Sequence, residues 1–111
     1  MMSTHGRLTK IVHFNLRTFR AVLQNDEAAL LPKAVRDAIE FRLVRLYFAA
    51  KDARAYDALP HQLAVHVANV RDALRPIENR SDLASLSKRL LNVCDGMRRA
   101  VEAHSSRADS V

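Results

Sequence analysis

The chain has 111 residues, of which 49% are apolar and only 5% aromatic. This length allows one domain, and a composition rich in Ala, Leu, Val and Arg favours helices over sheet. There is no apolar run of roughly eighteen residues, no apolar signal segment in the first ten residues, and no second cysteine for an internal disulfide. We therefore expect a cytoplasmic protein that does not contact a membrane.

The net charge of +6 is unevenly distributed along the chain. The first 25 residues contain Arg7, Lys10, Arg17 and Arg20 and no acidic residue, whereas the rest is nearly balanced. A basic face of this kind attracts phosphates, an acidic protein or an anionic surface. The other interpretation is an ordinary solvated helix face, and charge alone does not decide between the two.

The first predicted helix spans residues 8–24. One face carries the apolar residues at helical spacing, which are Leu8, Ile11, Val12, Leu16, Phe19, Val22 and Leu23. The opposite, polar face carries Lys10, His13, Arg17, Arg20 and Gln24, of which Lys10, Arg17 and Arg20 are candidate electrostatic contacts. Asn15 lies within the apolar face, where an unpaired amide is costly. We expect it to bond a neighbouring backbone group, although a buried Asn can also set the register of a helix pair.

A polar break at residues 24–28 follows, in which Asn25 or Asp26 is placed to cap a short turn that leads to Pro32. The second predicted helix spans residues 33–58 and ends before the next proline, Pro60. At roughly 39 Å it is long for a domain of this size.

A third helix is predicted for residues 60–75, and a fourth begins with Ser81 as its N-cap. Narrow apolar seams follow both, consisting of Leu63, Val67, Val70 and Leu74 on the third helix and of Leu83, Leu86, Leu90, Cys94, Met97 and Val101 on the fourth. We therefore predict an all-α fold. It is an antiparallel bundle of about four helices with one long central helix, and it is dimeric. Residues 1–111 form one domain, with 1–6 and 105–111 frayed.

The helix predicted at residues 33–58 has two apolar faces. One face, which includes Leu43, Leu46 and Tyr47 as expected core residues, consists of Ile39, Leu43, Leu46, Tyr47, Ala50 and Ala53. The other consists of Ala34, Phe41, Val44, Phe48 and Ala55. Either the chain's own helices cover both faces, or one face meets a second chain. The narrow seams elsewhere favour the second chain. Arginines, which are enriched at interfaces, flank the second face. The predicted protein interface is therefore Phe41, Arg42, Val44, Arg45 and Phe48.

No motif predicts catalysis, a cofactor or a metal. The five histidines have neither HxxxH nor HExxH spacing, and two glycines do not build a phosphate loop. Cys94 lies in an apolar seam, as a small core residue does. We do not expect an enzyme, and we assign no catalytic, cofactor-binding or metal-binding residue.

In chain length, basic N-terminal helix, long helix at residues 33–58 and Arg-Ala-Leu-Val composition, the chain resembles the small all-helical antiactivators of quorum sensing. That resemblance implies a homodimer that binds a LuxR-type transcription activator and inhibits its dimerisation or DNA binding. It assigns no individual residue. Which surface serves self-association and which serves the activator stays open, as does whether binding excludes DNA. The alternative function is a small basic DNA- or RNA-binding regulator that uses its N-terminal helix, and direct nucleic-acid binding is the second choice.

Overall fold

The computed structural model describes residues 4–52 and 59–109, and within these ranges it is helical without a strand. Four long helices make up most of it: α1 (Thr4–Leu23), α2 (Lys33–Asp52), α3 (Leu59–Ala73) and α5 (Ala84–Asp109). Three short elements connect them: η1 (Asp26–Leu30), α4 (Arg75–Glu78) and η3 (Ser81–Leu83). The predicted all-α class is confirmed.

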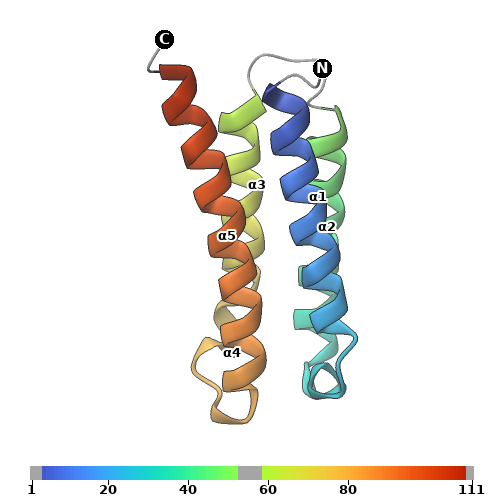
Figure 1. The fold of residues 1–111 in the computed structure, drawn as a ribbon. Helices are drawn as coiled ribbons and strands as arrows, with labels where there is room; N and C mark the ends of the chain where they lie inside the picture. Colours follow the sequence, from blue (N-terminus) through green and yellow to red (C-terminus); the bar gives the residue numbers. More distant parts are fainter. Residues whose placement is uncertain (1–3, 53–58, 110–111) are drawn as a thin grey trace.

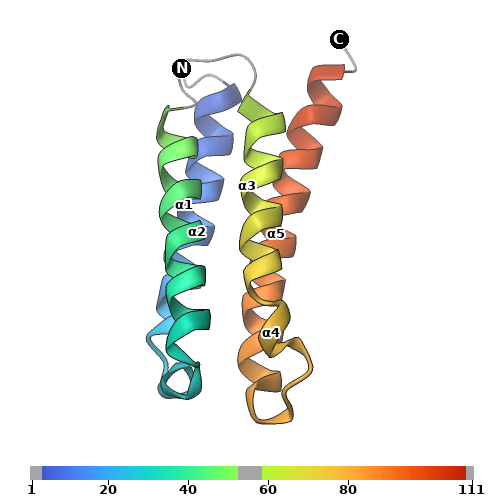
Figure 2. The same ribbon diagram turned by 180° about the vertical axis from the view of Figure 1, so that it is seen from behind.

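The four long helices lie side by side, and each runs opposite to the long helix before it in the chain (Figures 1 and 2). Their main contacts form a closed cycle in which α1 packs on α2, α2 on α3, α3 on α5, and α5 on α1. Each long helix thus has two long neighbours, and α5, with 26 residues, is the longest described element. The expectation of one long central helix is therefore wrong, because α2 occupies one position in this cycle.

The core consists of the apolar stripes that face the middle of this arrangement. From α1 it includes Leu8, Val12, Leu16, Phe19 and Leu23, and from α2 it includes Ile39, Leu43, Leu46 and Ala50. The seams predicted for the third and fourth helices are buried in full, although Leu74 follows the end of α3 and Leu83 lies in η3. They consist of Leu63, Val67, Val70, Leu74, Leu83, Leu86, Leu90, Cys94, Met97 and Val101. Two expected core residues differ, because Ile11 and Tyr47 are 45% and 40% exposed.

The helix boundaries differ from the sequence-based ones mainly at the ends. α1 begins at Thr4 and α5 continues to Asp109, so helix covers parts of the two segments expected to fray. α2 ends at Asp52 in the described part of the chain. Residues 53–58 of the helix predicted at 33–58, which include Ala53 and Ala55 of its two faces, lie outside the described residues.

The structure differs in detail from the two capping predictions. Asn25 occupies the N-cap position of η1 but makes no side-chain capping hydrogen bond. Ser81 does not cap α5 directly, because Ser81–Leu83 form a short 3-10 turn before α5 begins. Asp82 in this turn accepts hydrogen bonds from the Arg80 side chain, the shorter being 2.6 Å from Nη2. This bond holds the pKa of the Asp82 carboxyl below its usual value.

Candidate interaction surface

The outward side of α2 carries the three apolar residues that the sequence assigns to a second face. Phe41, Val44 and Phe48 are 56%, 42% and 51% exposed. No element within residues 4–52 and 59–109 covers them, because α1 and α3 pack on the flanks and inner side of α2. Within the described chain, the private-core interpretation of this face is therefore wrong. We call Phe41, Val44 and Phe48 the outer face of α2.

The spacing of the α2 residues produces both faces at once. Ile39, Leu43 and Leu46 recur at intervals of four and three, as do Phe41, Val44 and Phe48 at three and four. Each interval returns to the same side of a helix, and the two sets point in nearly opposite directions. Full burial of the outer face contributes a hydrophobic free energy on the order of 5–9 kcal/mol. Because these side chains are about half exposed, roughly half of that free energy would be gained on contact with another surface.

Arg42 and Arg45 are placed against the ring of Phe41. The guanidinium carbon of each lies 5.6 Å from the ring centroid, which is a cation–π distance. The pKa of His66 on α3 is lowered mainly by burial and, to a smaller extent, by the nearby charges of Arg45 and Arg42. The structure thus brings together Phe41, Arg42 and Arg45 of the predicted interface, at the side of α2 that borders α3.

Phe48 belongs to an aromatic row that continues onto α1. Its ring meets Tyr47 edge-on, with centroids 5.4 Å apart. Tyr47 in turn stacks on His13 of α1, with centroids 5.0 Å apart. Sequence reasoning missed this row, because Tyr47 was assigned to the core and His13 to a polar face. The available signal was the hydroxyl of Tyr47, since a tyrosine on the border of an apolar stripe usually keeps its polar end near water.

The three basic residues predicted on α1 have different surroundings. Arg20 forms an ion pair with Glu40 of α2, 3.8 Å apart, and thereby joins the two helices. Lys10 and Arg17 line a surface hollow together with His13 and Phe14, and Phe14 is 63% exposed. Lys10 and Arg17 thus lie together on one surface, whereas Arg20 lies next to a carboxylate of α2, and the ring of Phe14 was not among the residues predicted for this group.

Exposed apolar side chains are concentrated on α2. The large ones in the described part of the chain are Ile11, Phe14, Leu30, Phe41, Val44, Tyr47, Phe48 and Val65. Four of these eight lie on α2, within two turns of one another. Scattered single residues of this kind are normal on a protein surface, whereas a contiguous group marks a contact site.

Other chemistry in the described residues is limited. They contain no group of three or more His, Cys, Asp or Glu that is placed to hold a metal ion. Cys94 is 1% exposed, as expected, and burial raises the pKa of its thiol to about 12. A thiol with this pKa is almost entirely protonated near neutral pH and is a poor nucleophile.

None of the helices in residues 4–52 and 59–109 is long and apolar enough to cross a lipid bilayer. Comparisons of the chain with protein-family models, with curated proteins and with solved structures find no match.

Proposed function

We propose that this chain is a regulatory protein–protein interaction module, an antiparallel helical bundle that forms a homodimer through the outer face of α2. The observation that carries the proposal is the exposure of Phe41, Val44 and Phe48 on one side of a helix whose other side is fully buried. Leaving this group in water forfeits free energy and promotes nonspecific association. A second protein surface is the simplest way to recover it.

The charges on α2 favour a second copy of the chain as the occupant. Asp37 and Lys51 are both exposed, and each lies seven residues from Val44, in opposite directions. Residues seven apart share one side of a helix, so Asp37, Val44 and Lys51 form a line. If two α2 helices cross antiparallel about Val44, Asp37 of one faces Lys51 of the other at both ends. A symmetric dimer needs this kind of self-complementary surface.

The proposed target is a transcription activator of the LuxR type, whose dimerisation or DNA binding the protein inhibits. The support is the resemblance to quorum-sensing antiactivators in length, composition and basic N-terminal helix. The geometry adds a route. An exposed apolar helix face competes for the helical surface through which an activator self-associates, and lowers the activator's dimer population by mass action. We propose that the homodimer dissociates and that the outer face of α2 then binds the activator in place of the second copy of the chain.

The test is a titration of the protein into a LuxR-type activator bound to fluorescently labelled operator DNA. The proposal predicts that the wild-type chain lowers the anisotropy of the DNA and that Phe48→Asp does not. Asn92→Asp, which adds the same charge at an exposed position of α5, should act like wild type. Inhibition by Phe48→Asp as strong as by wild type would place the activator on another surface. No inhibition by wild type would remove this activator class and leave the homodimer to be judged separately.

A second candidate function is favoured by one specific observation. Phe14 is largely exposed and lines the same hollow as Lys10, His13 and Arg17. Exposed aromatic rings beside basic residues stack on the bases of single strands while the cations contact phosphates. Single-stranded oligonucleotide binding that Phe14→Ala weakens several-fold at physiological salt would support this function. Binding that disappears at about 200 mM salt and does not depend on Phe14 would be nonspecific attraction.

A further inference from the structure

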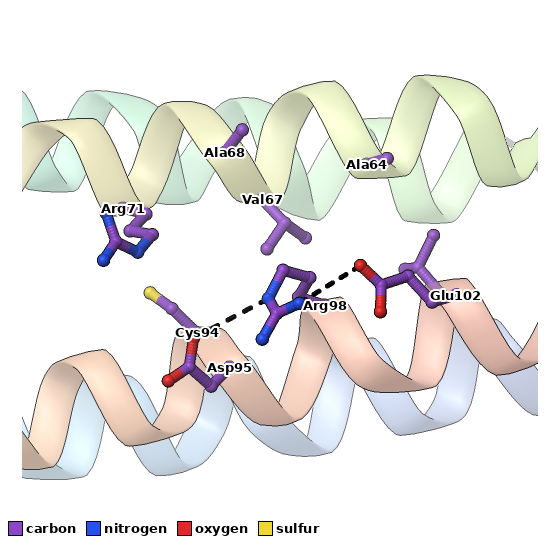
Figure 3. A pocket seen from close by; sticks show the side chains of 9 residues that line it. Ala64, Val67, Ala68, Arg71, Cys94, Asp95, Arg98 and Glu102 are labelled. Carbon is purple, nitrogen blue, oxygen red and sulfur yellow. Dashed lines mark hydrogen bonds and ion pairs between the residues drawn. The ribbon is translucent and has the colours of Figure 1, made fainter.

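A cavity of about 210 Å³ lies between α3 and α5, on a different side of α3 from its contact with α2 (Figure 3). Its floor consists of Val67 of α3 and of Cys94 and Val101 of α5, all of which are at most 3% exposed. Ala64 and Ala68 line it from α3. They are four residues apart and so lie on one side of that helix. Because both are small, the two helices leave a space that larger side chains would fill.

The charged residues around the cavity balance one another. Arg98 is paired with two carboxylates of its own helix, with Nε 3.7 Å from Asp95 Oδ1 and Nη1 3.2 Å from Glu102 Oε1. Figure 3 shows Arg98 between these two partners, with Val67 of the opposite helix directed toward it. Arg71 lines the α3 side and, among the described residues, forms a long ion pair with Glu78, with Nη1 4.0 Å from Oε1. Two arginines and two carboxylates thus surround an apolar interior.

This charge pattern disfavours both anions and cations inside the cavity. Burial is the largest cause of the raised pKa of the Cys94 thiol, so the floor of the cavity disfavours a negative charge. An anion there would lose its hydration. A cation would meet Arg71 and Arg98 at the rim. A neutral molecule avoids both costs. Arg71, which has the weaker pairing of the two arginines, has donors for an oxygen atom.

We infer that the cavity between α3 and α5 binds a small neutral aliphatic molecule, with its hydrocarbon part on Val67, Cys94 and Val101 and an uncharged oxygen-bearing end near Arg71. Apolar cavities of about 150 Å³ in helical proteins hold a molecule the size of benzene, so this cavity has room for a chain of about six carbons. The inference concerns a separate surface from the outer face of α2 and does not rest on the proposed function.

The test uses three probes with the same six-carbon chain: 1-hexanol, hexanoate and hexylamine. Binding is followed by NMR through the methyl signals of Val67 and Val101 in the full-length protein. The alcohol should bind most tightly and shift both residues. From 1-butanol to 1-hexanol, the affinity should increase about fourfold for each added methylene, because each buried CH2 contributes about 0.8 kcal/mol. Tighter binding of either charged probe would overturn the inference, as would the absence of any shift up to the solubility limit of 1-hexanol.

A cavity-filling variant gives a second, independent readout. Ala64→Leu should occupy the cavity and abolish the 1-hexanol shifts, and Ala68→Leu should do the same from the next turn. Ala103→Leu introduces the same side chain at an exposed position of α5 outside the cavity lining and should leave binding unchanged. All three keep a good helix former at a helical position, so each should retain the wild-type circular dichroism spectrum. Unchanged binding in a folded Ala64→Leu and a folded Ala68→Leu would show that 1-hexanol binds elsewhere.

Discussion

The imidazole of His13 on α1 stacks on the ring of Tyr47 on α2, with centroids 5.0 Å apart and planes inclined by 24°. Tyr47 also meets Phe48 edge-on, so one side chain joins the α1–α2 contact to the outer face of α2. This contact accounts for the exposure of Tyr47, because its ring turns toward α1 instead of entering the core. The position of Phe48 is thus coupled to the packing between two helices.

His13→Phe should stabilise the protein. The His13 Nε2 atom is buried and has no hydrogen-bond partner among the described residues, and an unpaired buried polar atom costs about 1–3 kcal/mol. Phenylalanine keeps an aromatic ring against Tyr47 without this cost, so the free energy of unfolding should increase by about 1 kcal/mol in urea denaturation. His13→Ala is the control. It removes the stack as well and should stabilise less or destabilise. A loss of stability in His13→Phe would mean that Nε2 has a partner.

The core residues were largely predictable because the helical spacing of apolar residues is a local property of the sequence. Leu8, Val12, Leu16 and Phe19 recur at helical spacing, and all four are buried as that spacing predicts. Ile11 has the same chemistry and lies at the edge of the same stripe, yet it is 45% exposed. Which edge of a stripe is covered depends on the angle at which the neighbouring helix approaches. That angle depends on both helices, so the apolar periodicity of one helix does not predict it.

Asn15 and Gly96 mark a close approach between α1 and α5. Asn15 Nδ2 donates to the backbone oxygen of Ile11 at 2.8 Å, which is the local bond expected for it. A Cβ atom added at Gly96 would lie 3.4 Å from Asn15 Oδ1, within ordinary contact distance. Gly96→Ala should therefore gain helix propensity without a clash and raise the free energy of unfolding by about 0.5–1 kcal/mol.

The matched control for this substitution is Gly96→Leu, whose longer side chain has to displace Asn15 and should lower stability. Both are measured by urea denaturation with helical circular dichroism as the signal. Destabilisation by Gly96→Ala itself would show that α1 and α5 approach each other too closely for a methyl group.

The protein should become less stable as the pH falls through the usual titration range of histidine. Burial, followed by the charges of Arg45 and Arg42, lowers the pKa of His66 from its ordinary value of 6.5. The unfolded chain therefore binds this proton more readily than the folded chain. The His66 contribution to stability is complete above pH 6.5 and decreases as the pH falls from there toward the lowered pKa. His66→Gln should remove this part of the pH dependence in urea denaturation.

The cause of that shift is open to a direct test. Arg45→Gln should raise the pKa of His66, measured by NMR titration of the imidazole, because it removes a nearby positive charge. Lys51→Gln removes the same charge from an exposed position of α2 whose charge is not among the causes of the shift, and it should leave the titration unchanged. An unchanged pKa in Arg45→Gln would mean that Arg45 does not lie near His66.

The candidate surface was predictable in its apolar residues and less so in its charged ones. Phe41, Val44 and Phe48 form a second stripe in the sequence, and the structure leaves that stripe exposed. The ion pair between Arg20 and Glu40 of α2 was not predicted, because it depends on how α1 and α2 pack. No pattern in the sequence predicted the cavity between α3 and α5. Ala64, Ala68, Cys94 and Val101 are ordinary helix residues until two helices place them around one space.

The most direct test of the central claim, that the outer face of α2 is a protein contact, is the mass of the protein in solution. Size-exclusion chromatography with light scattering should give twice the 12.5 kDa of one chain for wild type and for the exposed-site control Asn92→Asp. Phe48→Asp should give 12.5 kDa and retain the wild-type helical circular dichroism. A stable, soluble wild-type monomer at high micromolar concentration would contradict the claim, and so would a Phe48→Asp chain that unfolds.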